Sequence, residues 1–179
     1  MIAYRHADPR FPFLREDSSQ SAGRWNAPGE LTHYFCDTPD GAWAEFLRHE
    51  EIRDPRDVAT VRRALWAVEI GEIPSHQPGL LRETLTGGPD TWPECQQAAR
   101  GHREHADGIA GPSAALKTGA ARGWRVDGGL QPGPDRDGQV FALFGRRPDL
   151  IGWAATVDGR PGPDILPKVR HFEPDGPAR

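Results

Sequence analysis

Residues 21–35 read SAGRWNAPGELTHYF, a loop that leads directly into a strand-like segment. Glycine and proline mark turns, and loops carry a large share of the binding residues of proteins. This loop crowds three larger side chains between its glycines and its proline: Arg24, Trp25 and Asn26. From Leu31 onward, apolar and polar side chains alternate with the period of a β-strand, which places Tyr34 on the face of Cys36. We therefore predict a binding loop that ends on a strand.

The composition favours one soluble domain. The chain has 179 residues, of which 36% are hydrophobic and 27% charged, and its formal net charge is -4. We expect a single domain over residues 1–173 and a disordered tail at 174–179. An acidic chain has no general attraction to nucleic acid or anionic membranes, and no apolar run is long enough to span a bilayer. We therefore expect a cytoplasmic protein that binds neither, in which an anionic ligand would need a local cluster of arginines.

Strand and helix patterns alternate unevenly along the chain, which favours an α+β fold with a mixed β-sheet flanked by helices. Alternating stretches predict strands at MIAYR, LTHYFC, ALWAVEI, QVFALFG and DLIGWAATV. A helix is expected from about Pro39 to Glu51, because Thr38 can cap it and proline suits its first position. A second helix is expected from near Pro93, and a loop over residues 126–138.

The chain lacks the common catalytic and metal-binding motifs. No G-x-S-x-G, H-E-x-x-H, C-x-x-C or phosphate-binding glycine loop occurs. The best metal candidate is Cys95 with His102 and His105, but structural zinc sites need four closed ligands with closer cysteine spacing. We therefore interpret the two histidines as solvated residues of a helix face and predict no metal site. Cys36 and Cys95 are expected to be reduced thiols.

Four polar residues have both an ordinary and a functional interpretation. Taken singly, Arg24 fits a surface arginine packed on Trp25, and Glu45 fits a solvated helix residue. Tyr34 fits a half-buried strand residue, and Ser113 a turn hydroxyl bonded to its own backbone. In a functional site the guanidinium would instead grip a phosphate or carboxylate, and the tyrosine would offer a flat face to a ring. The functional interpretation depends on the residues acting as a set.

As a set, these residues resemble the RES domain family, which is named after an arginine, a glutamate and a serine. The family's three residues correspond here to Arg24, Glu45 and Ser113. The resemblance rests on YR at 4–5, GRWNAPG at 23–29, Tyr34, AWAEFLRH around Glu45 and GPSAAL around Ser113. It is tight over the first fifty residues and loose after about Ile70.

RES proteins are known as bacterial toxins that destroy NAD+ and are usually paired with a helix-turn-helix antitoxin. The resemblance therefore implies a fold similar to that of ADP-ribosyltransferases, an NAD+ cleft and an Xre-like antitoxin as partner. It implies no cofactor beyond NAD+ as substrate, with inorganic phosphate as an optional co-substrate. The residues expected to bind the substrate are Arg5, Arg24, Trp25, Asn26, Tyr34 and Ser113, and those expected to be catalytic are Glu45, Arg24 and Tyr34.

One carboxylate is enough for the chemistry of NAD+, because the cationic nicotinamide ring leaves as a neutral molecule. Its departure therefore needs no proton from a second acidic group. We assign Glu45 to the developing oxocarbenium charge, and Arg5 with Arg24 to the pyrophosphate. Tyr34 would stack on the nicotinamide or the ribose edge, and Ser113 would bond the amide or a ribose hydroxyl.

Several alternatives stay open at this point. The acceptor is water, inorganic phosphate or another nucleophile, and the last would make the protein an ADP-ribosyltransferase. A nucleotide-binding module without chemistry is the alternative from another class. Exposed tryptophans among the six in the chain would be compatible with a homodimer.

Overall fold

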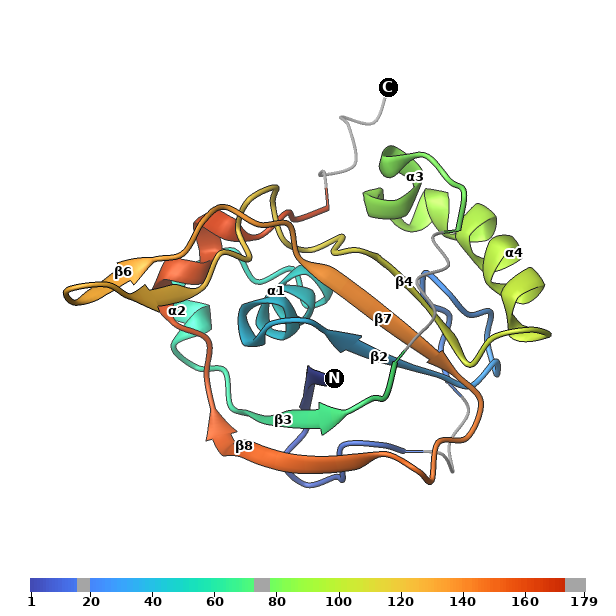
Figure 1. Cartoon of the computed structure of the whole chain (residues 1–179), viewed down its shortest axis with the longest axis horizontal. Coiled ribbons are helices and arrows are strands. Elements are labelled where there is room, and N and C mark those ends of the chain that lie inside the picture. Colours follow the sequence, from blue (N-terminus) through green and yellow to red (C-terminus); the bar gives the residue numbers. More distant parts are fainter. Residues whose placement is uncertain (16–19, 73–77, 173–179) are drawn as a thin grey trace.

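The computed structural model describes residues 1–15, 20–72 and 78–172. At its centre is a six-stranded sheet with the order β4-β7-β2-β1-β3-β8 (Figure 1). The six strands are β1 (Ile2–Ala7), β2 (Thr32–Cys36), β3 (Arg63–Glu69), β4 (Gly108–Pro112), β7 (Gln139–Phe144) and β8 (Ile151–Gly159). The predicted α+β class is confirmed, and the pairings in the described sheet are antiparallel rather than of both kinds. The expected tail at 174–179 lies outside the described residues.

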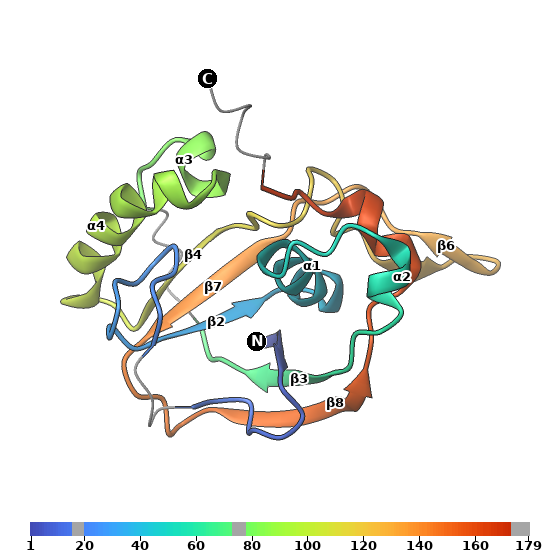
Figure 2. The same cartoon turned by 180° about the vertical axis from the view of Figure 1, so that it is seen from behind.

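The two main helices lie on the same face of the sheet, as Figures 1 and 2 show. Residues of β7 show this by alternation: Val140 packs with the apolar cluster of α1 (Pro39–His49), and Ala142 and Phe144 with that of α4 (Trp92–Arg103). Phe141 and Leu143 face the other side, where residues of the 11–15 segment cover them. The shorter helices are α2 (Pro55–Val58), α3 (Arg82–Thr86), and the 3-10 helices η1 (Pro89–Thr91) and η2 (Pro163–Lys168).

Helix α1 begins where the sequence predicts it. The backbone N–H of Gly41 donates to Thr38 Oγ1 at 3.0 Å, and proline occupies the first helical turn. Trp43 and Leu47 are buried and pack in the apolar cluster that joins the helix to the sheet. The helix ends at His49, two residues before the predicted end.

The sheet opens between its two central strands. β1 pairs with β3 over six residues, but its described pairing with β2 is confined to Tyr4 and Cys36. Where β1 has diverged, a side chain replaces the missing strand: Thr32 N donates to Gln20 Oε1, and Gln20 Nε2 donates to Thr32 O, both at 2.7 Å. The backbone N–H and C=O of Thr32 are thus hydrogen-bonded although β1 no longer lies beside β2 at this point.

The prediction of a loop over residues 126–138 is wrong in part. The strands β5 (Trp124–Val126) and β6 (Leu130–Pro132) form an antiparallel hairpin that projects from the body of the protein (Figure 1). Its turn contains Gly128 and Gly129, both with positive φ, which glycine adopts without strain. The glycine and proline content that suggested a loop therefore belongs to a tight turn and its flanks.

Candidate active site

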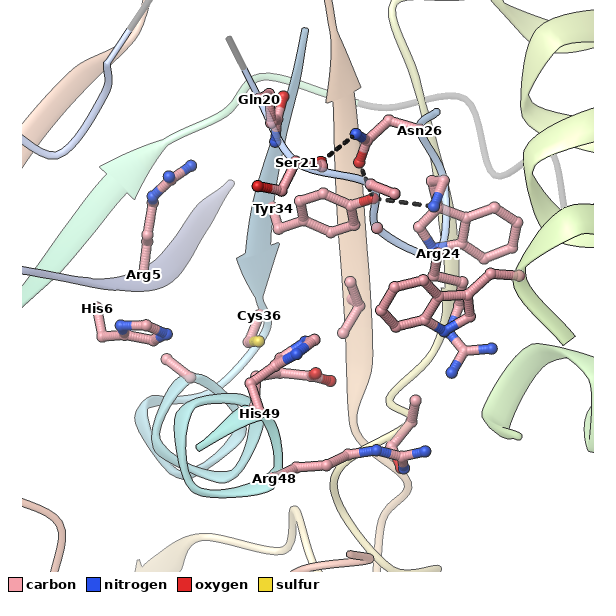
Figure 3. A pocket seen from close by; sticks show the side chains of 18 of the residues that line it. Arg5, His6, Gln20, Ser21, Arg24, Asn26, Tyr34, Cys36, Arg48 and His49 are labelled. Carbon is pink, nitrogen blue, oxygen red and sulfur yellow. Dashed lines mark hydrogen bonds between the residues drawn. The ribbon is translucent and has the colours of Figure 1, made fainter. Parts of the chain in front are cut away.

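A cavity of about 320 Å³ lies where β1 and β2 diverge, with α1 beside it (Figure 3). Residues from segments far apart in the sequence border it. Arg5 and His6 come from β1, and Tyr34 and Cys36 from β2. Six of the seven residues assigned from the sequence line it: Arg5, Arg24, Trp25, Asn26, Tyr34 and Glu45.

The loop at 23–26 is held in place by the Tyr34 hydroxyl. This hydroxyl donates to Asn26 Oδ1 at 2.7 Å and accepts from the backbone N–H of Trp25 at 2.9 Å. Burial raises the pKa of Tyr34, so the hydroxyl stays protonated. Gly23 closes the turn by pairing with Asn26, and a Cβ there would come within 2.8 Å of both Asn26 Oδ1 and the Tyr34 oxygen. The tightness of the GRWN turn therefore follows from glycine at its first position.

Trp25 and Asn26 are almost fully buried, with 2% and 0% of their surface exposed. Trp25 packs in the apolar cluster between α4 and the sheet, and Asn26 Nδ2 donates to the backbone oxygens of Ser21 and Ala27. In this structure both residues shape the wall of the cavity.

Arg24 reaches away from its loop to the segment before α4. Its Nη1 donates to Thr84 O at 2.9 Å and to Thr91 Oγ1 at 3.2 Å, and its Nη2 donates to Gly87 O at 2.7 Å. The surface arginine packed on Trp25 is therefore not what the structure shows. Arg24 ties two walls of the cavity together and borders the cavity as a cation.

Arg48 is a site residue that the sequence reasoning missed. It is 3% exposed, and it donates to the backbone oxygens of Ala114, Thr86 and Gly87. Burial lowers the pKa of its guanidinium to about 10, which leaves it charged at neutral pH. Arg48 and Arg24 thus converge on the same acceptor, Gly87 O, each at 2.7 Å. Its position three residues after Glu45 on a helix was the signal that could have revealed it.

Glu45 and Ser113 meet at the cavity, although the sequence separates them widely. Ser113 Oγ donates to Glu45 Oε1 at 3.4 Å and accepts from the backbone N–H of Leu116 at 3.1 Å. Glu45 is half-buried and lines the cavity. Ser113 is 3% exposed and lies behind the carboxylate instead of lining the cavity. In the structure Ser113 therefore contacts the Glu45 side chain, and the expected direct contact of Ser113 with a substrate in the cavity is not what the geometry favours.

The β1 border of the cavity carries positive charge. Arg5 lines it, its guanidinium lies 5.9 Å from the centre of the Phe35 ring, and its Nη1 is buried with no hydrogen-bond partner in the described part of the chain. Burial lowers the pKa of Arg5 to about 10. Beside it, burial and the charge of Arg63 lower the pKa of His6 to about 3, so His6 is neutral. Nη2 of Arg63 lies 3.3 Å from His6 Nδ1, which must act as the acceptor because a guanidinium can only donate.

The described residues hold no group of histidine, cysteine and carboxylate side chains that could bind a metal ion. Cys36 and Cys95 are free and buried, and burial raises the pKa of both thiols. Nucleophilic thiol chemistry is therefore not favoured here. Among the described helices, none is long and apolar enough to cross a bilayer.

The fold and the site together define a class of protein. It is an α+β protein with one half-buried carboxylate at a cavity bordered by arginines. Residues 2–127 match the RES domain family, so the chain belongs to this family. A solved structure with a similar fold is a chain of the M. tuberculosis MbcT–MbcA toxin–antitoxin complex, with a TM-score of 0.56 and 17% identity. The alignment covers 93% of this chain and 86% of that one. No curated protein matches this chain.

Proposed function

We propose that this protein cleaves the bond between nicotinamide and ribose in NAD+. The observation that carries the proposal is the Glu45 carboxylate, which lies 3.4 Å from Ser113 Oγ and lines a cavity bordered by Arg5, Arg24 and Arg48. The membership of the RES family supports it. A single carboxylate among cations suits a substrate with a pyrophosphate and a cationic ring that leaves as a neutral molecule.

In the proposed reaction, the bond between C1′ of the ribose and the nicotinamide nitrogen breaks, and its electron pair stays on the nitrogen. The ring loses its positive charge and leaves without needing a proton. Positive charge then develops on the ribose, where the Glu45 carboxylate stabilises it. A water oxygen attacks C1′ and releases a proton, which gives ADP-ribose. Inorganic phosphate at the same position would give the 1″-phosphate of ADP-ribose.

A quantitative assay of nicotinamide release tests the proposal. Purified protein is incubated with NAD+, with and without inorganic phosphate, and the products are separated by chromatography. Nicotinamide should appear, and the identity of the ribosyl product decides between water and phosphate as acceptor. Folded protein that releases no nicotinamide under either condition contradicts the proposal. Label transferred to a macromolecule instead would point to ADP-ribosylation.

We also propose that the protein acts as a toxin restrained by an antitoxin. The similar solved chain belongs to a complex described as a toxin–antitoxin complex, and this likeness supports the proposal. Induced expression in a bacterial host should lower cellular NAD+ and stop growth, whereas expression of Glu45→Gln should do neither. Growth arrest by Glu45→Gln to the same extent would separate toxicity from NAD+ cleavage and contradict this link.

A further inference from the structure

Three aromatic rings surround one end of the cavity and have no part in the proposed bond cleavage. They are His49, the last residue of α1, Trp92, the first of α4, and Phe172, which follows η2. The His49 ring lies 6.3 Å from the Trp92 ring and 6.2 Å from the Phe172 ring, between centroids, with interplanar angles of 54° and 75°. All three line the cavity, so we call them the aromatic mouth.

The aromatic mouth is a built feature rather than a chance meeting of surface residues. The backbone oxygen of Phe172 accepts a hydrogen bond from Arg53 Nη2 at 2.6 Å, and the Arg48 guanidinium lies 4.3 Å from the centre of the Phe172 ring. Trp92 is partly buried, and its Nε1–H is buried without a hydrogen-bond partner in the described part of the chain. A buried donor without a partner is costly, so a ligand acceptor there would be favoured. His49 is exposed and marks the outer end of the mouth.

The order of chemical groups along this wall is carboxylate, cation, aromatic ring. Glu45, Arg48 and His49 are spaced i, i+3 and i+4 on α1, so they share one face, and His49 lies about 6 Å further along the helix axis than Glu45. Figure 3 shows Arg48 and His49 projecting from this helix beside the cavity. The Arg48 guanidinium in turn contacts Phe172. NAD+ has the same order of groups: the reacting ribose, then the pyrophosphate, then the adenosine.

We propose that the aromatic mouth is the subsite for the adenine ring of the substrate, with Trp92 and Phe172 as its main stacking surfaces. This inference rests on the proposed function and deepens it. Adenine fits better here than nicotinamide, because the cationic guanidiniums next to the mouth would repel the positively charged nicotinamide ring. The non-reacting end of the dinucleotide can also lie at an exposed mouth, whereas the scissile bond is better enclosed. Purine stacking on aromatic side chains is sequence-tolerant chemistry that needs only flat faces.

The test compares ligands that contain or lack adenine. The affinities of ADP-ribose and of nicotinamide mononucleotide are measured by titration calorimetry for the wild-type protein and for Trp92→Ala. The ratio of the two affinities should shift by about tenfold or more against ADP-ribose, since stacking on one aromatic residue contributes on that scale. Trp92→Phe keeps a ring and should restore most of the ADP-ribose affinity.

Matched controls separate stacking from loss of fold. Trp124→Ala removes an indole that is 67% exposed on the hairpin, outside the cavity, and should leave both affinities unchanged. Because Trp92 is partly buried, His49→Ala provides a second variant at an exposed position, and it should weaken ADP-ribose binding in the same direction. Thermal melts of all variants confirm that the folded protein is being compared.

The outcomes distinguish this inference from the proposed function. Weakening of nicotinamide mononucleotide alone in Trp92→Ala would place nicotinamide at the mouth and overturn the inference. Equal weakening of both ligands would also overturn it, because the effect would then not depend on adenine. Unchanged ADP-ribose affinity in Trp92→Ala and His49→Ala, or no ADP-ribose binding by the wild-type protein, would also overturn it. Selective loss of ADP-ribose affinity would support the subsite even if the wild-type protein released no nicotinamide, because calorimetry requires no turnover.

Discussion

The Glu45 carboxylate accepts a hydrogen bond at 3.4 Å from Ser113 Oγ, which lies 68 residues further along the chain. The first prediction concerns the carboxylate itself. Glu45→Gln keeps the shape of the side chain and removes its charge, so nicotinamide release should fall by about a hundred- to a thousandfold. The measurement is the initial rate with saturating NAD+. Glu50→Gln, an exposed change at the end of the same helix, is the control and should retain the wild-type rate.

The second prediction concerns Ser113. Ser113→Ala should lower the rate less than Glu45→Gln, because the hydroxyl acts through the carboxylate. It should also reduce the free energy of unfolding by about 1–3 kcal/mol, since the buried N–H of Leu116 loses its acceptor. Rates of Ser113→Ala, Glu45→Gln and the double variant form a cycle. Additive losses in this cycle would show that the two residues act independently.

The third prediction concerns Tyr34. Tyr34→Phe leaves Trp25 N without its acceptor and Asn26 Oδ1 without its donor. Urea denaturation should show a loss of about 1–3 kcal/mol in unfolding free energy. Tyr4→Phe is the matched control, because no hydrogen bond of its hydroxyl is found in the described part of the chain. A loss in Tyr4→Phe equal to that in Tyr34→Phe would contradict this explanation.

The fourth prediction concerns Arg24. Arg24→Lys keeps the charge, but a single ammonium cannot span the acceptors on Thr84, Gly87 and Thr91. The segment from α3 to the start of α4 should detach from the loop at 23–26, and amide hydrogen exchange in α3 should become faster. Exchange in α3 that stays at the wild-type rate would show that the segment is held by its apolar contacts alone. Arg100→Lys, at an exposed position of α4, is the control.

The fifth prediction is a pH dependence of stability from His6. Its pKa is lowered to about 3 by burial and by the positive charges of Arg63, Arg5 and His49. Below the ordinary value of about 6.5 the unfolded chain takes up a proton that the folded protein rejects, so stability falls as pH decreases towards 3. The slope from this group is about 1.4 kcal/mol per pH unit.

Urea denaturation between pH 7 and pH 5.5 measures this slope, because carboxylates with ordinary pKa values near 4 stay almost fully ionised in that range. His6→Gln should flatten it. The pKa of His171 is also lowered by burial, so His171→Gln is run alongside to separate the two contributions. An unchanged slope in His6→Gln would mean that His6 is protonated in the folded protein.

Local signals explain the parts of the fold that the sequence predicts. The strand at 32–36 follows from strict alternation, and helix α1 follows from the Thr38 cap and the Pro39 start. The hairpin at 124–132 was missed because Trp124, Val126 and Leu130 are exposed, so its alternation does not reflect burial. The glycines and prolines nearby favour a loop instead.

The sequence predicts which residue types belong to the candidate site, but it does not predict the contacts that those residues make. Glu45 and Ser113 were assigned by resemblance, and the structure brings them together. Two of the partners of Arg24 are backbone oxygens about sixty residues away, and every residue has a backbone carbonyl, so the sequence gives no signal for them. Trp92 and Phe172 come from a helix start and an irregular segment, where no periodicity points to a common site.

The divergence of β1 from β2 also makes the cavity a seam in the protein. In the described strands, one residue pair, Tyr4 with Cys36, joins the half of the sheet containing β4, β7 and β2 to the half containing β1, β3 and β8. A dinucleotide bound in the seam would touch both halves and act as a clasp between them. Ligand at a hundred times its dissociation constant would add about 2.7 kcal/mol to the unfolding free energy. The protein should therefore be most easily pulled apart, or degraded, when its own substrate has been exhausted.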